Sequence, residues 1–185
     1  MNNALIEPWK ADAASLGNDL DMLGHLLHAC VLAGASVSFI LPFSQDDAKA
    51  FWRDQTLPAV TAGLRSVLLA RWEGRIVGSV QLDLATPPNQ PHRAEVRKLL
   101  VHPEARRRGI AASLMTALEA EARRRRRTLL TLDTVTGGYA ERLYRSLGYV
   151  AIGAIPGYAL NFNSNEREAT TIMYKDLQEN ASTGA

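Results

Sequence analysis

The apolar residues of this chain change period from one segment to the next, and this alternation is the strongest constraint on its fold. From Leu20 to Ala35, and again from Ile110 to Ala122, they recur every three or four positions, as on one face of a helix. Other segments are apolar runs of strand length: SVLLARW, RIVGSVQLDL, AEVRKLLV, TLLTLDT, YVAIGAI and TTIMYKDL. Helices and strands mixed in this way predict an α/β domain with a central sheet.

The length fits a single domain. The chain has 185 residues, and 46% of them are apolar, which suits one core rather than two. It shows no internal repeat and no linker that would divide it. We therefore expect one domain over residues 1–178 and a disordered, frayed tail over residues 179–185.

Local signals set the expected boundaries of several elements. The pair Glu73-Gly74 lies between two strand-like runs and predicts a hairpin turn. Ser44, followed by Asp47, resembles a capping box that begins a second helix. Pro58 is expected to kink or end that helix.

Composition indicates the cellular compartment in which the protein is expected. Cys30 is the only cysteine, which excludes an intrachain disulfide and a multi-cysteine zinc site and suits a reducing cytoplasm. The first 14 residues lack the basic-then-apolar plan of a signal peptide. The stretch from Met22 to Gln45 has no Asp, Glu, Lys or Arg, but polar residues interrupt it before the roughly 20 apolar positions that span a bilayer. We expect a cytoplasmic protein without a membrane segment.

The net charge of +2 hides a strongly basic segment. Between Arg93 and Arg127, eleven Lys or Arg residues stand against four acids, a surplus of seven. Of the 21 basic residues in the chain 17 are Arg, whose planar guanidinium group matches phosphate oxygens. The expected partner of this segment is a polyanion, either a nucleotide-bearing cofactor or a nucleic acid.

The loop that opens the helix at Ile110 has the composition of an anion site. Residues 106–111 read RRRGIA, and free backbone N–H groups and the positive end of the helix dipole meet there. Gly109 has no Cβ to keep a phosphate away from the backbone. The alternative is a surface loop with solvated arginines and a glycine needed for a turn.

This loop resembles the acetyl-CoA loop of the GNAT superfamily of N-acetyltransferases, which reads Gln or Arg, two residues, Gly, one residue, then Gly or Ala. Arg106, Gly109 and Ala111 match that pattern. The resemblance covers residues 65–149 well, since VRKLLVHPEARRRGIAASLM and LYRSLGY are similar to other parts of the family's pattern. Within the superfamily, GASVSF, RAEVRKLLV, LLTLDT, AERLY and IPGYA are similar to the tabtoxin resistance acetyltransferases, which act on a β-lactam amino acid antibiotic.

The resemblance implies a single-domain GNAT fold, with a mostly antiparallel twisted sheet flanked by helices. In this fold strands 93–101 and 128–134 splay apart, and backbone groups left open by the sheet bind the pantetheine arm of acetyl-CoA. The implied cosubstrate is therefore acetyl-CoA. By resemblance its contacts would come from Leu99, Leu100, Val101, Arg106, Arg107, Arg108, Gly109, Ile110, Ala111 and Ala112.

The implied reaction transfers acetyl directly to a primary amine, which needs a base for the amine and an acid for the departing thiolate. Tyr144 stands at the family's general-acid position; without the motif, a core tyrosine is the simpler interpretation. Glu95 and Asp133 are acids in otherwise apolar strands, so each is a candidate base, direct or through water, or a ligand for the substrate's ammonium. Alternatively, Glu95 is exposed and paired with Arg93 or Arg97, and Asp133 caps a loop.

Three features are interpreted as structural. Residues 123–127 are all arginine, but no aromatic residues interleave with them for stacking on bases, so we expect a solvated helix end. His25 and His28 share a helix face without further metal ligands nearby. Cys30 lies on the same helix with no positive neighbour in the sequence, which argues against a reactive thiol. We expect no metal and no nucleic-acid partner.

The resemblance suggests a small amino-acid-like or antibiotic acceptor. Two alternatives stay open: acetylation of a protein or peptide amine, and a regulator that binds acyl-CoA without catalysis. Gly137 occupies a position that is often Asn in these enzymes, which puts one pantetheine contact in doubt, and Tyr158 in IPGYA is a candidate substrate contact. An apolar surface from Phe39 to Phe43 would permit a homodimer.

Overall fold

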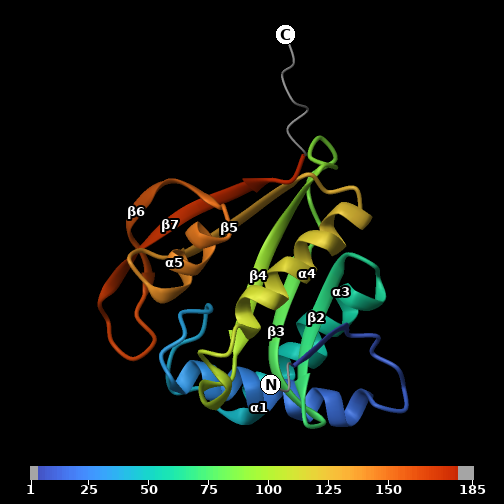
Figure 1. Cartoon of the computed structure of the whole chain (residues 1–185). Coiled ribbons are helices and arrows are strands. Elements are labelled where there is room, and N and C mark those ends of the chain that lie inside the picture. The colour runs from blue at the N-terminus through green and yellow to red at the C-terminus, as the bar shows by residue number, and fades with distance from the viewer. Residues whose placement is uncertain (1–3, 179–185) are drawn as a thin grey trace.

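A seven-stranded sheet forms the centre of the computed structural model, which describes residues 4–178 (Figure 1). The strand order is β1-β2-β3-β4-β5-β7-β6. Only β4 and β5 are parallel neighbours; the other neighbouring pairs are antiparallel. This mixed α/β fold confirms the expected class, while the expected tail lies outside the described residues. The strands are β1 (Leu5–Pro8), β2 (Arg65–Trp72), β3 (Arg75–Asp83), β4 (Arg93–Val101), β5 (Leu129–Val135), β6 (Val150–Leu160) and β7 (Arg167–Asp176).

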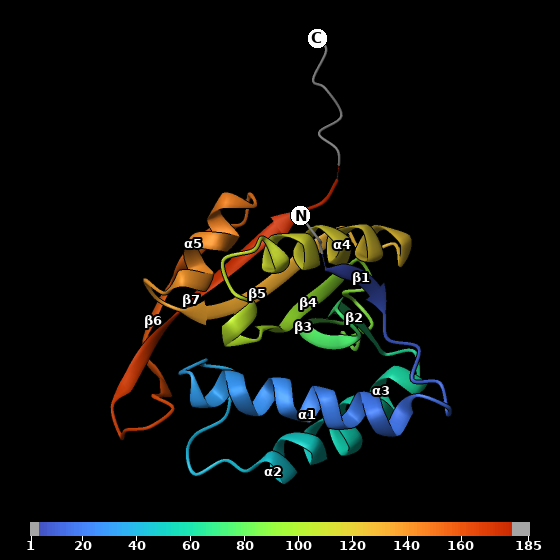
Figure 2. The ribbon, with the colours of Figure 1, turned by 60° about the horizontal axis from the view of Figure 1, so that its bottom comes forward.

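Helices cover both faces of the sheet. On one face lie α1 (Leu16–Leu32), α2 (Gln45–Ala50) and α3 (Leu57–Thr61), and on the other α4 (Ile110–Arg124) and α5 (Tyr139–Ser146) (Figure 2). Strand side chains alternate between the two faces, and β2, β3 and β4 contribute residues to two separate core clusters. The α4-side cluster includes Leu68, Leu82, Val96, Leu114, Leu118 and Leu130. The α1-side cluster includes Leu23, Leu27, Trp52, Val67, Leu69 and Leu100.

The local signals are confirmed at two places, and at a third the expected helix end is wrong. Glu73 and Gly74 have φ values of 50° and 76°, as a two-residue hairpin turn requires, and the capping box at Ser44 begins α2. Pro58 does not end the second helix. A π-helical segment over Phe51–Thr56 continues α2 into α3, and Pro58 lies in the first turn of α3, where a missing N–H is tolerated.

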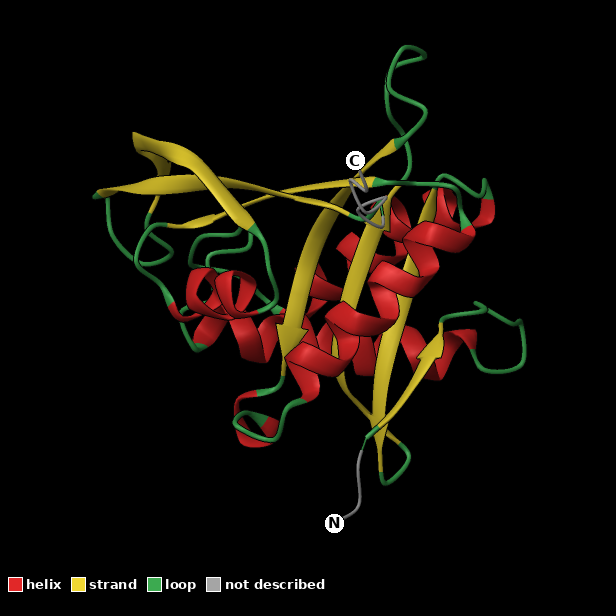
Figure 3. Ribbon diagram, turned by 45° about the horizontal axis from the view of Figure 1, so that its top comes forward, coloured by secondary structure: helices red, strands yellow, loops and turns green. Residues whose placement is uncertain are grey.

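The parallel strands β4 and β5 pair only at their beginnings. Residues 93–95 pair with residues 129–131, and beyond them the two strands splay apart (Figure 3). Arg93 fastens the closed end by donating to the Thr131 hydroxyl at 2.9 Å. Along residues 96–101, the backbone groups of β4 that face β5 therefore have no strand partner in the described sheet. The expected gap is confirmed.

A β-bulge lies on β4 beside this gap. The register with β3 shifts so that two β4 residues, Lys98 and Leu99, stand opposite Val80 alone. Lys98 has a φ of 50°, in the left-handed region that residues other than glycine seldom adopt. The bulge interrupts the alternation of side chains just where β4 leaves β5.

Gly78 on β3 lets α4 approach the sheet closely. A Cβ at this position would lie 3.1–3.2 Å from the Leu100 carbonyl oxygen and the Ile110 and Leu114 side chains. A larger residue would have to push the first turn of α4 away from the sheet. Gly78 thus helps to set the N-terminus of α4 at the end of β4.

Candidate active site

The loop after β4 ends at a helix N-terminus with free donors. Gly109 is the N-cap of α4 with a φ of 76°, and the first intrahelical bond shown runs from the Ser113 N–H to the Gly109 carbonyl. The N–H groups from Gly109 to Ala112, which include those of Ile110 and Ala111, precede that bond and have no partner within the helix. No acidic residue occupies the first turn. The positive end of this helix is therefore available to an anion.

The arginine side chains of the loop are partly engaged by the protein. Arg106 Nε donates to the Val101 carbonyl at 3.3 Å, and the Arg108 guanidinium lies 4.2 Å from the centre of the Trp72 ring. Arg107 has a positive φ of 64° and an exposed side chain. The backbone N–H groups are thus the most direct candidates for contact with a diphosphate.

The predicted pantetheine contacts Leu99, Leu100 and Val101 all lie on the stretch of β4 that β5 leaves uncovered. Leu100 is buried in the α1-side core, whereas Leu99 and Val101 are partly buried against the α4-side core. The structure therefore brings these residues and the loop after β4 to one end of the gap.

Arg106 corrects one expectation about Cys30, because a positive group does lie beside this thiol. Burial nevertheless outweighs it and raises the pKa of Cys30 to about 11. The thiol donates to the Val101 carbonyl at 3.4 Å. A thiolate nucleophile is therefore disfavoured at neutral pH.

Tyr144, on α5, is 6% exposed and belongs to the α4-side core. Its ring packs against Tyr149 with the two centroids 5.7 Å apart. Burial, with a smaller contribution from the charge of Asp133, raises the pKa of Tyr144 above its ordinary value of 10. The phenol is therefore protonated at neutral pH and able to donate a proton.

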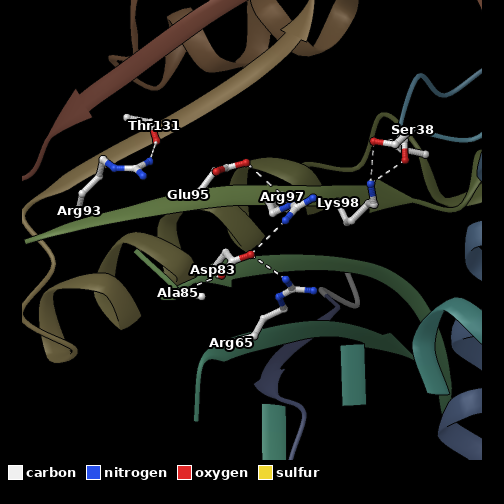
Figure 4. Close-up of polar contacts among 10 residues, drawn as sticks. Ser38, Arg65, Asp83, Ala85, Arg93, Glu95, Arg97, Lys98 and Thr131 are labelled. Atoms are coloured by element: carbon white, nitrogen blue, oxygen red, sulfur yellow. Dashed lines mark hydrogen bonds and ion pairs between the residues drawn. The ribbon is translucent and has the colours of Figure 1, made fainter. Parts of the chain in front are cut away.

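Polar and charged side chains cross the other face of the sheet in one row (Figure 4). By register Arg65, Asp83, Glu95 and Thr131 are neighbours on β2, β3, β4 and β5. Asp83 accepts hydrogen bonds from Arg65 at 2.7 Å and from Arg97 at 3.1 Å. Arg97 also lies 3.8 Å from the Glu95 carboxylate, which confirms the pairing considered for that acid. We call Arg65, Asp83, Glu95 and Arg97 the charged row.

Asp83 anchors the charged row. Its burial disfavours the carboxylate, but the Ala85 N–H and the guanidinium groups of Arg65 and Arg97 together hold the pKa of Asp83 below its ordinary value of 3.8. Sequence reasoning missed this residue. Asp83 is the last residue of its strand. Its pairing with Arg65 and Arg97 depends on strand register, which cannot be derived from the sequence.

The two candidate bases flank the point where β4 and β5 part. Glu95 is the last paired residue of β4, and its side chain is 40% exposed. Asp133 lies two positions beyond the last paired residue of β5 and is exposed. Because Leu130 and Leu132 point into the α4-side core, Asp133 faces the same side as the charged row. Tyr144 approaches from the opposite face.

Lys98 is a residue of this region that sequence reasoning did not single out. Its ammonium group donates to the Val37 carbonyl at 2.7 Å and to the Ser38 hydroxyl at 3.1 Å (Figure 4). It also lies 5.2 Å and 5.6 Å from the centres of the Phe39 and Phe51 rings. A lysine beside the apolar end of RAEVRKLLV was as unusual as Glu95 and was the available signal.

The arginine run lies at the end of α4, as expected. Arg124 and Arg125 pair with Glu121, and Arg127 donates to the Pro91 carbonyl. His25 stacks on His102 with ring centroids 5.5 Å apart. Across residues 4–178, no three or more His, Cys, Asp or Glu side chains gather in a way that would hold a metal ion.

Three expectations concern residues at the edge of this region. The apolar surface expected at Phe39 and Phe43 is wrong in part, because both rings pack against the α1-side core and each other; Ile40 between them is exposed. Tyr158 is exposed on β6. Gly137 has a φ of 76° and donates its N–H to Glu141 at 2.6 Å.

A cavity of about 710 Å³ lies beside the loop after β4. Its lining includes His25, Trp72, His102 and Arg108. The lining contains none of Glu95, Asp133 and Tyr144.

The family model described as Acetyltransferase (GNAT) family matches residues 35–149. This chain belongs to the GNAT acetyltransferase family. The GNAT fold and the enzyme class expected from the resemblance, an acyltransferase, are thereby confirmed. The similarity to the tabtoxin resistance subgroup stays a prediction.

Solved structures agree with the family at the level of the fold. The Salmonella typhimurium protein yncA, solved with its cofactor acetyl-CoA, has a TM-score of 0.73 at 22% identity, covering 100% of this chain and 99% of that one. An N-acetyltransferase from Staphylococcus aureus Mu50 has a TM-score of 0.77 at 18% identity, with coverages of 96% and 100%. The ribosomal-protein-alanine N-acetyltransferase from Brucella melitensis has a TM-score of 0.73 at 25% identity, with coverages of 94% and 99%.

Within the described residues, no helix combines the length and the apolar character needed to cross a bilayer.

Proposed function

We propose that this GNAT enzyme binds acetyl-CoA in the gap between β4 and β5 and transfers the acetyl group to a primary amine of a small amino-acid-like acceptor. The observation that carries the proposal is the divergence of the two strands directly after Glu95. The free N-terminus of α4 lies at one end of the gap, Glu95 and Asp133 flank the point where the strands part, and Tyr144 lies on the opposite face of the sheet.

The residues present fit acetyl-CoA. The uncovered backbone of β4 over residues 96–101 would pair with the amides of the pantetheine arm, and the N–H groups of residues 109–112 would hold the diphosphate. Bound there, acetyl-CoA supplies an activated thioester. Gly109 suits this cradle for two reasons: its φ is positive, and no protein atom lies within 4 Å of where a Cβ would stand.

Glu95 and Asp133 are the groups placed to hold the acceptor's ammonium and to take its proton, directly or through water. The neutral amine nitrogen then bonds to the thioester carbonyl carbon, and a backbone N–H near the β4 bulge would stabilise the negative charge on the oxygen. As the bond between that carbon and sulfur breaks, Tyr144 donates its proton to the departing thiolate, and the nitrogen, which carries one extra proton after the new bond forms, gives that proton to the tyrosinate. The products are the N-acetyl acceptor and CoA.

The acceptor class is supported by the resemblance to the tabtoxin resistance acetyltransferases and by the charged row. A row that contains both arginines and carboxylates suits a zwitterion better than a simple amine. A β-lactam amino acid of the tabtoxin type is one candidate, and antibiotic resistance is then the role. A cytoplasmic location and a homodimer belong to the same proposal.

Release of CoA thiol in the presence of a panel of amines tests the function. We expect free amino acids to accelerate thiol release from acetyl-CoA well above hydrolysis, and mass spectrometry to find the N-acetyl product. The variants Glu95→Gln and Asp133→Asn are compared by pH profile, since the variant that lacks the base loses the acidic limb. Activity on peptide amines alone would instead support the protein-acetylating alternative, and no activity on any amine would contradict the proposal.

A further inference from the structure

We propose that Lys98 binds a carboxylate of the acceptor and thereby selects amino acids over simple amines. The inference rests on the proposed function, because it assigns a specificity contact within the same site. The surroundings of the Lys98 ammonium group are the main observation behind it.

The known partners of Lys98 are neutral. Two of its three N–H donors are directed to the Val37 carbonyl and the Ser38 hydroxyl. Among residues 4–178, no carboxylate lies within 4.0 Å of its nitrogen, whereas Arg65 and Arg97 share Asp83. Lys98 is therefore the cation of this region that has a spare donor and no direct counter-ion.

The other charges near Lys98 also favour a bound anion. The charges that act on Lys98 are Arg97 on its own strand, Arg65 on β2, Asp133 on β5 and Glu95 on β4. Burial and the two arginines outweigh the two acids and lower the pKa of Lys98 to about 8. A partly buried cation in such surroundings gains when an anion binds beside it.

There is also room for a small group. A cavity of about 160 Å³ is lined by Phe51, Gln55, Arg65, Gln81, Arg97 and Lys98. Two buried polar atoms of its lining, Arg65 Nε and Gln81 Oε1, have no hydrogen-bond partner among the described residues. Both atoms are closed to solvent, so Lys98 and Arg97 are the cationic side chains of the lining that a ligand could reach.

The site thus offers separate places for the two charges of an amino acid. Glu95 and Asp133 would hold the ammonium, and Lys98 the carboxylate. Glu95 and Lys98 lie on β4, and Asp133 lies on β5 just beyond the last residue that pairs with β4, so the three groups frame one part of the gap. Because Lys98 also holds Val37 and Ser38, the same contact links the acceptor to the loop between α1 and α2.

The first experiment compares a panel of L-amino acids with their carboxamides, which keep the amine and lose the negative charge. For the wild-type enzyme we expect kcat/KM to be higher for the amino acid by about 10- to 100-fold, the worth of one charge-assisted hydrogen bond. In Lys98→Gln this ratio should fall to nearly one, mainly through KM. Lys98→Arg should retain most of it, and Ser38→Ala, which removes only a neutral contact, should leave it unchanged.

The second experiment uses the pH dependence. With the amino acid, wild-type kcat/KM should fall above a pH of about 8, where the Lys98 ammonium loses its proton. Arginine stays charged at this pH, so Lys98→Arg should lack that fall. The carboxamide should lack it with either enzyme. The raised pKa of Tyr144 places its own titration at higher pH.

The outcomes separate this inference from the function it rests on. A wild-type enzyme that acetylates no amine contradicts the proposed function. A wild-type enzyme that acetylates amino acids and carboxamides equally well supports the function and overturns the role of Lys98. Retention of the amino-acid preference in folded Lys98→Gln, or the same alkaline fall in Lys98→Arg, also overturns it. If Lys98→Gln does not fold, the wild-type comparison and Lys98→Arg decide.

Discussion

The two sides of the gap between β4 and β5 are built from different chemical groups. The cofactor side is mainly backbone: the uncovered edge of β4 and the N–H groups that begin at Gly109. The proposed acceptor side is made of side chains: the charged row, Asp133 and Lys98. A backbone site depends on chain conformation, whereas a side-chain site depends on the identity of each residue. The fold alone can thus specify the cosubstrate, and individual residues choose the acceptor.

Replacing the proposed general acid should have the largest effect, because Tyr144 would supply the proton that the departing thiolate needs. We expect Tyr144→Phe to lower kcat by about 10²- to 10⁴-fold and to leave the dissociation constant of acetyl-CoA unchanged. Steady-state kinetics and equilibrium titration measure the two quantities. Tyr149→Phe, at the neighbouring buried ring, is the control and should retain its turnover. Full activity in Tyr144→Phe would remove the acid from the mechanism.

Breaking the charged row at its anchor should cost stability. Asp83→Asn leaves two guanidinium groups without their shared carboxylate, and we expect a loss of about 2–4 kcal/mol in the free energy of unfolding at pH 7, near the range for a broken buried ion pair. Urea denaturation measures this loss. Asp54→Asn is the control, because that carboxylate belongs to an exposed pair with Arg53 and should matter far less.

The same variant has a defined pH signature. The pKa of Asp83 in the folded chain is below its ordinary value of 3.8, so the ionised carboxylate stabilises the fold at pH values above that. This contribution is lost as the pH falls through the folded pKa. The stability difference between wild type and Asp83→Asn should therefore narrow below a pH of about 4. A difference that stays constant or grows there would contradict the assignment.

The cofactor side could be predicted from the sequence because its signals are local. The run RRRGIA, the apolar end of β4 and the helix from Ile110 lie within one short stretch, and each has a conformational reason to be where it is. A glycine directly before an amphipathic helix can be recognised in the sequence from the residue type and the apolar period that follows it. Tyr144 and the two framing acids, Glu95 and Asp133, were predicted from the motif and from their place in apolar strands, and their roles stay predictions.

The acceptor side could not be predicted to the same extent. The partners of Asp83 come from β2 and β4 and are set by register. Lys98 was visible as a charge in an apolar strand, but its bulge and its contact with the Val37 carbonyl depend on packing between distant segments. Pro58 failed as a helix terminator for a similar reason, since the π-helical turn before it absorbs the change in hydrogen bonding.

A change of backbone conformation at the anion site should have a moderate effect. Gly109 has a φ of 76°, which costs a residue with a Cβ about 1–2 kcal/mol. We expect Gly109→Ala to weaken acetyl-CoA binding by about 5- to 30-fold, measured by calorimetry. Gly63→Ala is a matched control, since Gly63 has a φ of 70° and equally open space around it. It should lose similar stability and keep its affinity; equal losses of affinity in both variants would contradict a local role for Gly109.

The smallest effect should come from the arginine that looks most like a phosphate ligand. The Arg108 guanidinium lies over the Trp72 ring, so Arg108→Glu changes the charge near the anion site without removing any backbone donor. We expect acetyl-CoA affinity to fall by only about two- to five-fold, as for exposed charge interactions, and the difference from wild type to shrink at high salt. The acetyl-CoA affinity of Arg108→Ala should lie between that of the wild type and that of Arg108→Glu. A loss in Arg108→Glu as large as that in Gly109→Ala and insensitive to salt would mean that side chains hold the diphosphate. The two sides of the gap would then not differ in the way described above.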